Sequence, residues 1–379
     1  MRWPDCIITP TIGANGPVYV VATDITRNVY IGGAFTSVGG VTTGPAAVLR
    51  YGSTTWQALS GLNATNFASG AKVYAFTIDC NNLPNSLSTA PPCDVYVGGA
   101  FQLTAPSGSV ATNLAKYDYS SKSWDVLAGH GMTYNSTVVY ALAKKDFGVT
   151  SSTKKLWVGG DLGSSTYLKY YDSSKSQWSN VAGPNAPVRT VYYNPNLFST
   201  DELYVGGSFN FTSGSVSCNL VCKLLISSTA WNAVGSSNQL GSGLVSSIGY
   251  YSGNVYVSGS ITNKLMLLKA NNKDWIQVSP TPTLPAATTT INSIDVCGTD
   301  DLGCKAGSVS TGGDGSLLKF FNNYDGSWTD FSGSSLSNGN STFIVNSVVS
   351  QYVISHASVV SFSSVIVMIA LIVSLMFVF

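Results

Sequence analysis

A motif ending in two glycines recurs along the chain and restricts the folds that this sequence can adopt. It reads VYIGGAF at 29–35, VYVGGAF at 95–101, LWVGGDL at 156–162 and LYVGGSF at 203–209, with a weaker copy, VYVSGSI, at 255–261. A Gly-Gly pair after an aromatic residue is compatible with a phosphate-binding loop, a tight turn or a structural repeat. The spacing of the other residues decides between these alternatives.

The tryptophans share the period of the glycine motif. Seven of the 8 stand at positions 3, 56, 124, 178, 231, 275 and 328, which are 53, 68, 54, 53, 44 and 53 residues apart. Trp157 leaves the series because it replaces the Tyr of one glycine motif. A shared period of about 53 residues indicates tandem copies of one structural unit.

Each unit carries the signals of four short strands. The first is an apolar run such as VYAF at 73–76, and the second is the glycine motif. The third is a run such as KYYD at 169–172, which leads through a polar turn to the fourth strand, marked by the tryptophan. Short β-type runs separated by turn residues predict hairpins, and no sustained helical period occurs before the C-terminal segment.

Four strands in a unit of this length predict an all-β fold, a β-propeller in which each unit is one blade. Six complete repeats would begin near residues 18, 73, 138, 188, 245 and 291. The chain start with Trp3 and the run FIVNSVVSQYVIS at 343–355 would share a seventh blade, which removes the free edges of the ring. The predicted propeller domain therefore spans residues 1–357.

The repeated glycines and tryptophans are interpreted as structural. We expect the doublet to let the second strand leave the sheet with positive φ, and to let blades approach without a Cβ between them. A phosphate-binding loop would need a following helix, whereas Phe and a polar loop follow here. The positions are Gly32, Gly33, Gly98, Gly99, Gly159, Gly160, Gly206 and Gly207, with Trp56, Trp124, Trp178, Trp231, Trp275 and Trp328 in equivalent fourth strands.

These motifs resemble two known kinds of repeat. A Gly doublet ending the second strand, a Tyr-Asp before a short turn and a Trp six residues later resemble the kelch repeat. The GGAF and GGSF endings are similar to the repeats of fungal Rax2-type cortical surface proteins. The resemblance covers residues 1–357 and implies a propeller blade, but these motifs are structural and do not name a ligand.

Composition narrows the class of partner. Only 10% of the residues are charged, against about 25% in typical soluble domains, and the formal net charge is +1. Ser, Thr, Asn and Gly take the place of charged residues, which suits an extracellular β-protein. Because no basic block is present, we expect no nucleic-acid partner.

Four of the 7 cysteines indicate disulfides and an oxidising compartment. Cys80 with Cys93, and Cys297 with Cys304, occupy the same place in two units, between the first and second strands. Each pair flanks a loop whose ends must meet to continue the sheet, which favours a disulfide.

The remaining cysteines allow a second interpretation. Cys218 and Cys222 could suggest zinc, but a zinc site needs about four ligands, and the only histidines, His130 and His356, are far away in sequence. We therefore predict a third disulfide between Cys218 and Cys222 that closes a local loop, and no metal or cofactor. Cys6 is left without a partner in this chain.

Four glycosylation sequons are distributed in a regular way. Asn63, Asn135 and Asn340 follow a tryptophan by 7, 11 and 12 residues, in loops before the next first strand. Asn210 follows a glycine motif, in a loop between second and third strands. Since both loop types emerge at the same edge of an up-and-down blade, we expect all four sequons on one face.

Propellers also carry enzymes, so we tested the sequence for catalytic groups. A galactose-oxidase-like copper site needs two His ligands, and Ser-His-Asp catalysis needs one, but the chain has only His130 and His356. NYDGSW at 323–328 faintly resembles the Asp-box of sialidases, although Asp325-Gly326 also makes the expected turn.

The acids give no clear catalytic pair. Asp118 and Asp172 stand where they would cap the turn before the fourth strand. Glu202 is the only Glu and directly precedes a second strand. The acids not explained by the repeat are Asp146, Asp161, Asp300 and Asp301. No set of these residues meets the tests for a catalytic site.

The two ends of the chain were compared with known targeting and membrane-anchoring signals. Residues 359–379 contain no charge and are long enough to span a bilayer as a helix. Because no Lys or Arg follows them, a lipid-anchor signal is an equal alternative to a transmembrane helix. The start, MRWPDCIITP, has no apolar run, from which we expect a chain shortened at its N-terminus.

Two hypotheses about function remain. The first is a non-enzymatic propeller at the cell surface or on a secretory-pathway membrane, which binds a protein or glycan partner. The second is a carbohydrate-active oxidase or hydrolase on the same scaffold. They differ in whether a central funnel gathers acids, Tyr and His. If the chain leaves after the seventh blade, the sequon face lies toward the membrane and the 80–93 and 297–304 loops form the contact surface.

Overall fold

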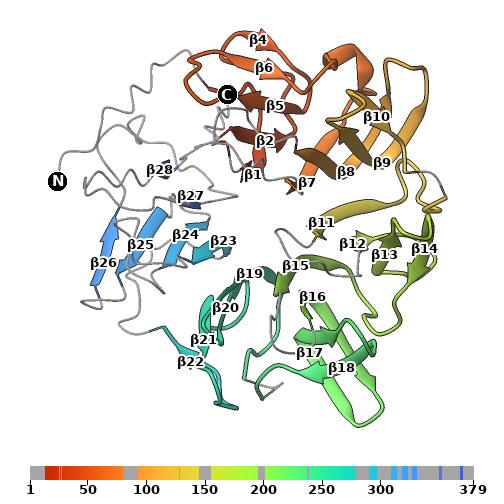
Figure 1. Cartoon of the computed structure of the whole chain (residues 1–379). Coiled ribbons are helices and arrows are strands. Elements are labelled where there is room, and N and C mark those ends of the chain that lie inside the picture. Colours follow the sequence, from red (N-terminus) through yellow and green to blue (C-terminus); the bar gives the residue numbers. More distant parts are fainter. Residues whose placement is uncertain are drawn as a thin grey trace, which may run out of the picture.

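The computed structural model shows an all-β propeller of four-stranded sheets arranged around one axis (Figure 1). It describes residues 13–24, 26, 28–80, 93–127, 129–144, 155–194, 201–236, 239–278, 290–296, 309–313, 318–322, 327–330, 350–351 and 368–369. Within these residues the only helical element is the short 3₁₀ helix η1 (Ala64–Asn66). The sequence-based prediction of the fold class is therefore confirmed.

In each sheet four consecutive strands pair antiparallel, as the repeat predicted. The sheets are β1 (Val18–Thr23), β2 (Val29–Gly33), β5 (Ala46–Leu49) and β6 (Trp56–Ala58); β7 (Lys72–Asp79), β8 (Asp94–Thr104), β9 (Val110–Asp118) and β10 (Ser123–Asp125); β11 (Val138–Lys144), β12 (Lys155–Asp161), β13 (Leu168–Asp172) and β14 (Gln177–Asn180); β15 (Val188–Asn194), β16 (Glu202–Ser213), β17 (Val216–Leu225) and β18 (Ala230–Ala233); β19 (Val245–Tyr251), β20 (Asn254–Gly259), β21 (Leu265–Leu268) and β22 (Ile276–Gln277); and β23 (Ile291–Val296), β24 (Val309–Gly313), β25 (Leu318–Asn322) and β26 (Ser327–Asp330). A small hairpin, β3 (Ser37–Val38) with β4 (Val41–Thr42), extends the first blade.

The predicted six complete blades with a shared seventh are found only in part. Five blades, β1 to β22, are described through all their strands, and β23 to β26 pair in the same order. Beyond them β27 (Ser350–Gln351) pairs with β28 (Met368–Ile369), whose residues belong to the predicted C-terminal helix. Trp3, Cys6 and most of 343–357 lie outside the described residues.

The predicted C-terminal helix is not supported. In 359–379 the described residues are Met368 and Ile369, and they belong to strand β28. The segment is rich in Val and Ile, whose branched side chains favour strands, so an apolar run alone did not fix the element type. Among the described residues, no helix has the length and hydrophobicity to cross a membrane.

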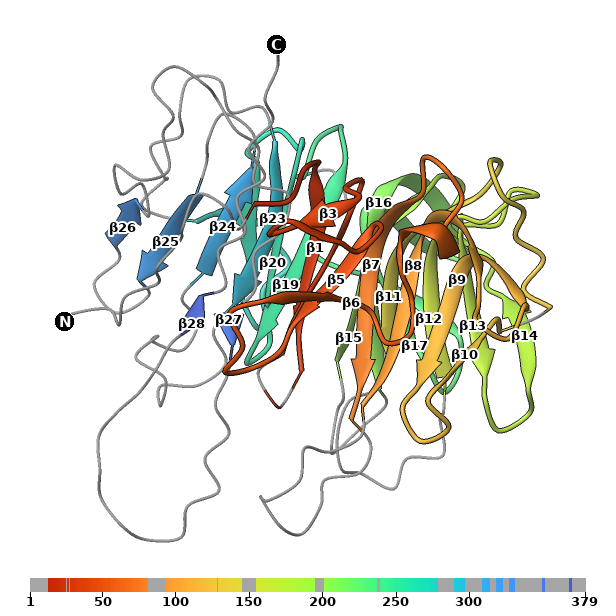
Figure 2. The same ribbon diagram turned by 90° about the horizontal axis from the view of Figure 1, so that it is seen from above.

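The first strand of every sheet lies nearest the axis. β1, β7, β11, β15, β19 and β23 contact one another in succession, whereas the fourth strands lie at the outside (Figure 1). Figure 2 shows the sheets standing side by side with their strands roughly upright, so loops gather at two edges. Loops before first strands share one edge with the loops between second and third strands, as an up-and-down order requires.

The first glycine of each doublet makes room for the next blade. A Cβ at Gly98 or Gly159 would lie 2.5 Å from Cγ1 of Val139 or Val188, which begin the following blades. At Gly206 the corresponding distance to Val245 Cγ1 is 2.7 Å. The expected close approach of blades without a Cβ is confirmed, because real Cβ contacts of this length do not occur.

The second glycine answers a different constraint. A Cβ at Gly99, Gly160 or Gly207 would meet the backbone carbonyl of the first strand in the same blade. The predicted positive φ is wrong, since none of the eight doublet glycines has the left-handed conformation. The first position of the doublet requires glycine because the next blade occupies the space of a Cβ. The second position requires glycine because the backbone of the same blade lies there.

The residue at the end of each glycine motif anchors the blade in its core. Phe35, Phe101, Leu162, Phe209 and Ile261 hold this place, and each is at most 2% exposed. Phe35, Leu162 and Ile261 lie just beyond the end of the second strand, whereas Phe101 and Phe209 lie within the longer strands β8 and β16.

The tryptophans connect each blade to the one before it. Nε1 of Trp124 donates to the carbonyl of Ser60 (2.9 Å), and Nε1 of Trp231 donates to Ala182 (2.8 Å). Trp275, just before β22, bonds to Val234 in the same way (3.1 Å). Trp56 Nε1 is buried without a partner among the described residues. Trp56, Trp124, Trp178, Trp231 and Trp328 face Leu49, Tyr117, Tyr171, Leu224 and Phe321 in equivalent registers.

Two of the three predicted disulfides lie within the described residues. Cys80 and Cys93 are joined at the ends of β7 and β8 and are both buried. Cys218 and Cys222 are also joined, but both belong to β17. That bond crosses an irregularity at Leu220 (φ 62°) rather than closing a loop between strands, which corrects the sequence-based interpretation. Cys297 and Cys304 lie outside the described residues.

We expect Gly98→Ala to destabilise the propeller by about 1–3 kcal/mol, because its Cβ overlaps Val139 in the next blade. The double variant Gly98→Ala/Val139→Ala should lose less stability than the sum of the losses in Gly98→Ala and Val139→Ala, since the overlapping methyl groups are absent from it. Urea unfolding measures all three variants. Gly13→Ala serves as the control, because a Cβ there meets nothing within 4 Å. Additive effects in the double variant would contradict the proposed contact.

Replacing both Cys80 and Cys93 by Ala should lower the free energy of unfolding by about 3 kcal/mol, because the disulfide closes a short loop of the unfolded chain. The wild type and the double variant are compared by thermal unfolding without reductant. Reduction of the wild type should shift its unfolding midpoint toward that of the double variant. An unchanged midpoint in the double variant would contradict this assignment.

Candidate functional site

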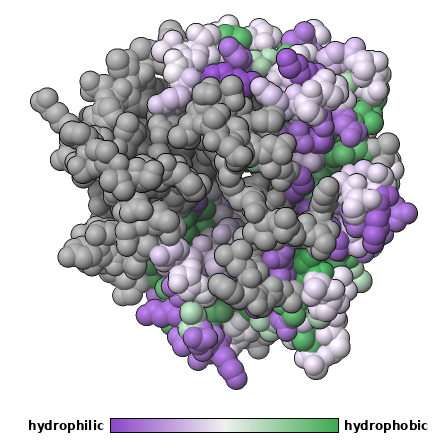
Figure 3. Space-filling view, viewed as in Figure 1, coloured by the Kyte–Doolittle hydropathy of each residue, from purple (hydrophilic) through white to green (hydrophobic). Residues whose placement is uncertain are grey.

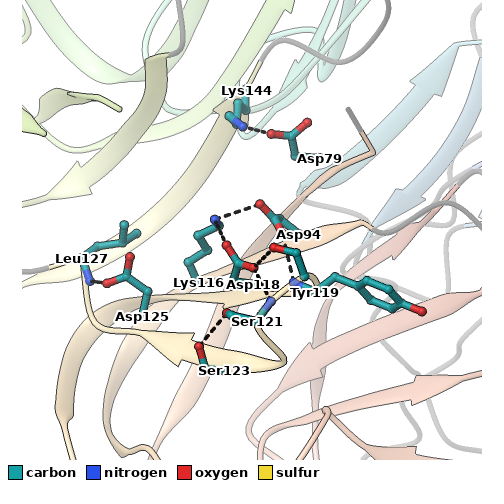
Figure 4. Close-up of polar contacts among 11 residues, drawn as sticks. Asp79, Asp94, Lys116, Asp118, Tyr119, Ser121, Ser123, Asp125, Leu127 and Lys144 are labelled. Carbon is teal, nitrogen blue, oxygen red and sulfur yellow. Dashed lines mark hydrogen bonds and ion pairs between the residues drawn. The ribbon is translucent and has the colours of Figure 1, made fainter. Parts of the chain in front are cut away.

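Two acids of the second blade share one lysine across the middle strands β8 and β9. Lys116 Nζ lies 2.8 Å from both Asp94 and Asp118, as Figure 4 shows. Asp118 also accepts from the Ser121 N–H (3.0 Å), so its predicted turn-capping role is present. The hydrogen bond from Lys116 is the main reason that the pKa of Asp118 falls below its usual range.

A second ion pair crosses from one blade to the next. Asp79 at the end of β7 pairs with Lys144 at the end of β11, and the Asp79 side chain is completely buried (Figure 4). Lys144 also lies 5.3 Å from the ring centre of Tyr96. A buried carboxylate that is neutralised by a Lys is part of the packing between blades and is not available to a substrate.

The other acids have similar structural roles. Glu202 pairs with Lys223 (2.7 Å) and accepts from the Tyr204 hydroxyl (3.1 Å). Asp172 accepts from the Ser174 N–H (3.0 Å) and so caps its turn, as predicted. Asp161 ends β12, opposite Val138. Asp146, Asp300, Asp301 and Asp325 lie outside the described residues.

His130 is a buried structural residue. Its Nδ1 accepts from the Met132 N–H (3.0 Å), its carbonyl accepts from Lys169 Nζ (2.7 Å), and its ring meets Trp178 edge-on. Burial, helped by the nearby Lys169, lowers the pKa of His130. His356 lies outside the described residues. Within the described ranges no three His, Cys, Asp or Glu side chains gather as metal ligands would.

A different set of side chains lies at the inner edge of the sheets. Each first strand has an irregularity in its pairing near its start, where one residue is bulged out of register. The bulged residues are Tyr19, Tyr74, Tyr140, Arg189, Ser246 and Asn292, in the order of the blades. A bulge re-aims a side chain, so one residue per blade is directed away from the regular sheet.

Four of these side chains form a continuous row, which we call the axial ladder. Tyr19 stacks on Tyr74 with ring centres 4.9 Å apart, and Tyr74 meets Tyr140 at 5.4 Å. Arg189 Cζ lies 3.8 Å from the centre of the Tyr140 ring, which is a cation–π contact. Four successive blades therefore contribute one side chain each. Beyond the row, the Ser246 hydroxyl donates to the carbonyl of Ile291 (2.8 Å).

The axial ladder offers donors that the protein leaves unused. Among the described residues, no hydrogen bond or ion pair involves the hydroxyls of Tyr19, Tyr74 and Tyr140 or the guanidinium of Arg189, whose Nε is buried. All four side chains are half-buried. Burial raises the pKa of Tyr74 to about 12 and that of Tyr19 above its usual value, so both hydroxyls keep their protons at neutral pH.

Sequence reasoning missed the axial ladder although its signal was present. The ladder residue is the second letter of each first-strand run, as in VYAF at 73–76 and VRTVYY at 188–193. A strictly alternating strand would turn this residue away from the buried Val beside it. The bulge, which the sequence did not reveal, brings the residues of neighbouring blades into contact.

The described sequons lie toward the same edge as the axial ladder. Asn63 and Asn135 precede the first strands β7 and β11, and Asn210 lies in the extended β16–β17 hairpin; all three are exposed. The two kinds of loop meet directly, since Asn66 Nδ2 donates to the carbonyl of Thr104 (2.8 Å). Asn340 lies outside the described residues.

Two other surface features are weaker candidates. A cleft of about 20 Å³ between the first two blades, lined in part by Tyr30, Arg50 and Tyr119, has room for little more than one water. In Figure 3 the described part of the face is mostly pale or purple, with small separate green groups. Neither feature matches the row of partnerless donors in the axial ladder.

Comparison with known proteins supports the repeat assignment. Residues 179–346 match the family model described as the Rax2 C-terminal beta propeller domain. This match confirms the Rax2-type resemblance over that part of the chain, while nothing specifically confirms a kelch-type repeat. No curated protein matches the chain.

Solved structures show the same fold at low sequence identity. An extracellular domain from B. thetaiotaomicron, assigned to a one component system, is 13% identical with a TM-score of 0.52. It covers 90% of this chain, and this chain covers 36% of it. A second structure, assigned to a hybrid two component system of the same organism, is 12% identical with the same TM-score, covering 89% and 36%. The chain thus spans about a third of the structures it matches.

We expect acid to destabilise the protein through His130. Its pKa is lower in the folded than in the unfolded chain, so the unfolded chain binds the proton first and stability falls as the pH drops below about 6.5. His130→Asn, whose side-chain oxygen can accept the Met132 N–H, should flatten this dependence between about pH 7 and about pH 5.5. Urea midpoints across this range test it. Equal losses in both proteins would contradict the assignment.

Proposed function

We propose that the chain is a non-enzymatic, extracytoplasmic propeller module that binds its ligand at the axial ladder. The observation that carries the proposal is the contrast between two sets of polar groups. The described acids named above are largely engaged in ion pairs and turn caps, whereas the Tyr hydroxyls and the Arg189 guanidinium have no partner in the described structure. Polar groups left unpaired at a half-buried surface favour ligand binding over packing.

The location outside the cytoplasm rests on independent features. The disulfide Cys80–Cys93 favours an oxidising compartment, and the exposed Asn63, Asn135 and Asn210 are accessible to glycosylation. The apolar composition of residues 359–379 is compatible with a lipid-anchor signal, the alternative to a membrane helix. The Rax2-type match and the extracellular origin of the similar structures are consistent with this placement.

The ladder position changes the expected contact surface. The sequence pointed to the edge that carries the 80–93 and 297–304 loops, because the chain was expected to leave toward the membrane from the sequon edge. The axial ladder instead starts where the first strands begin, at the opposite edge, near Asn63 and Asn135. We therefore place the ligand at the edge that carries the sequons.

Binding by the purified chain to saccharide and peptide arrays tests the proposal. We expect a ligand whose binding falls at least about tenfold in Tyr74→Ala, which removes the centre of the ladder, and falls less in Tyr74→Phe, which removes one hydroxyl. Arg50→Gln is the matched control, because Arg50 lies in the turn after β5, outside the ladder.

Thermal unfolding of each variant separates loss of binding from loss of fold. Ligands that bind Tyr74→Ala and Tyr74→Phe as well as the wild type would overturn the ladder as the binding site. Conversion of a bound saccharide into product by the wild type would overturn the non-enzymatic assignment.

A further inference from the structure

We propose that the axial ladder recognises a carboxylate-bearing saccharide, with Arg189 holding the carboxylate and the three Tyr hydroxyls holding sugar oxygens. This inference rests on the proposed function and names the chemistry of its ligand. It follows from four features of the ladder. These are the single cation Arg189, its N–H groups without protein partners, the Tyr hydroxyls beside it, and the distances between the rings.

Arg189 supplies the only charge of the ladder. Its guanidinium carbon lies 3.8 Å from the centre of the Tyr140 ring, and no hydrogen bond within the described structure uses its buried Nε. No carboxylate of the described residues pairs with it, unlike Lys116, Lys144 and Lys223. A planar set of N–H donors matches a carboxylate with two parallel hydrogen bonds.

The stacking on Tyr140 also limits the motion of the arginine. A long side chain that is already held by an aromatic ring loses less rotamer freedom when its ligand arrives. Arg189 is further placed by the bulge in β15, between the paired residues Val188 and Thr190. The guanidinium is thus positioned before binding, as expected for a recognition residue.

The remaining members of the ladder carry phenol hydroxyls. Tyr19 and Tyr74 have raised pKa values because they are partly buried, and therefore present protonated hydroxyls. Tyr19 stacks on Tyr74, whereas the rings of Tyr74 and Tyr140 are tilted by 54° to each other. Each hydroxyl can donate once and accept, as sugar hydroxyls do, which allows reciprocal pairs with a saccharide.

The balance of charge favours a saccharide over an acidic peptide. One cation beside three neutral hydroxyls complements a ligand with one anionic group among several neutral oxygens. A peptide rich in Asp and Glu would need several cations, and the neighbouring positions of the row hold Ser246 and Asn292 instead. The distance between successive ring centres, 4.9 Å and 5.4 Å, is comparable with the length of one sugar unit.

Isothermal titration with short oligogalacturonates tests the inference, using the purified, disulfide-bonded chain. We expect binding by the wild type and a loss of about 10- to 100-fold when the sugar carboxyl groups are reduced to alcohols. Arg189→Gln should bind the acidic and the reduced sugar equally weakly. Arg189→Lys should fall between wild type and Arg189→Gln, because it keeps the charge and loses the planar donors.

The controls distinguish failure of this inference from failure of the proposed function. Arg50→Gln should bind oligogalacturonates like the wild type, and Tyr74→Phe should weaken acidic and reduced sugars by the same factor. Equal wild-type affinity for both sugars, or tighter binding of polyglutamate than of oligogalacturonate, would overturn the saccharide carboxylate. If the wild type binds only other ligands, and Tyr74→Ala abolishes that binding, the inference fails while the proposed function stands.

Discussion

The contact between a glycine of one blade and a valine of the next governs the rest of this structure. With no Cβ at Gly98 or Gly159, the first strand of the following blade approaches until its Val fills that space. This approach brings the first strands into contact around the axis. The bulged side chains of adjacent strands then stand 4.9–5.4 Å apart, which is the distance at which aromatic rings stack. The ladder is therefore a product of blade spacing.

The sequence predicted the blade well because both of its markers have strict local requirements. A Trp whose indole N–H must find a carbonyl, and a Gly that faces a neighbour's methyl group, tolerate few replacements and so remain visible as a period. Blade closure was predicted less well. The run at 343–355 resembles strands, but pairing of chain ends is a long-range choice that local composition does not encode.

The candidate site was hidden for a related reason. Tyr74 and Arg189 occupy strand positions at which alternation assigns an ordinary sheet side chain, and only the bulge redirects them. A bulge inserts one residue without a distinctive sequence, so period-2 reasoning could not place these residues together. The acids were easier to judge, since Asp118 and Asp172 stand in turn positions whose capping role follows from local geometry.

The hydrogen bonds from the tryptophans all point back along the chain, which bears on the order in which blades can form. Trp124, Trp231 and Trp275 each donate to a carbonyl 41 to 64 residues earlier in the chain. During synthesis the acceptor is therefore already present when its indole leaves the ribosome, and each new blade can dock on a completed predecessor. The contact of the glycine doublet points forward along the chain, because Gly98 packs against Val139 of the following blade, which is synthesised later. This order of contacts would allow assembly from the N-terminus one blade behind translation.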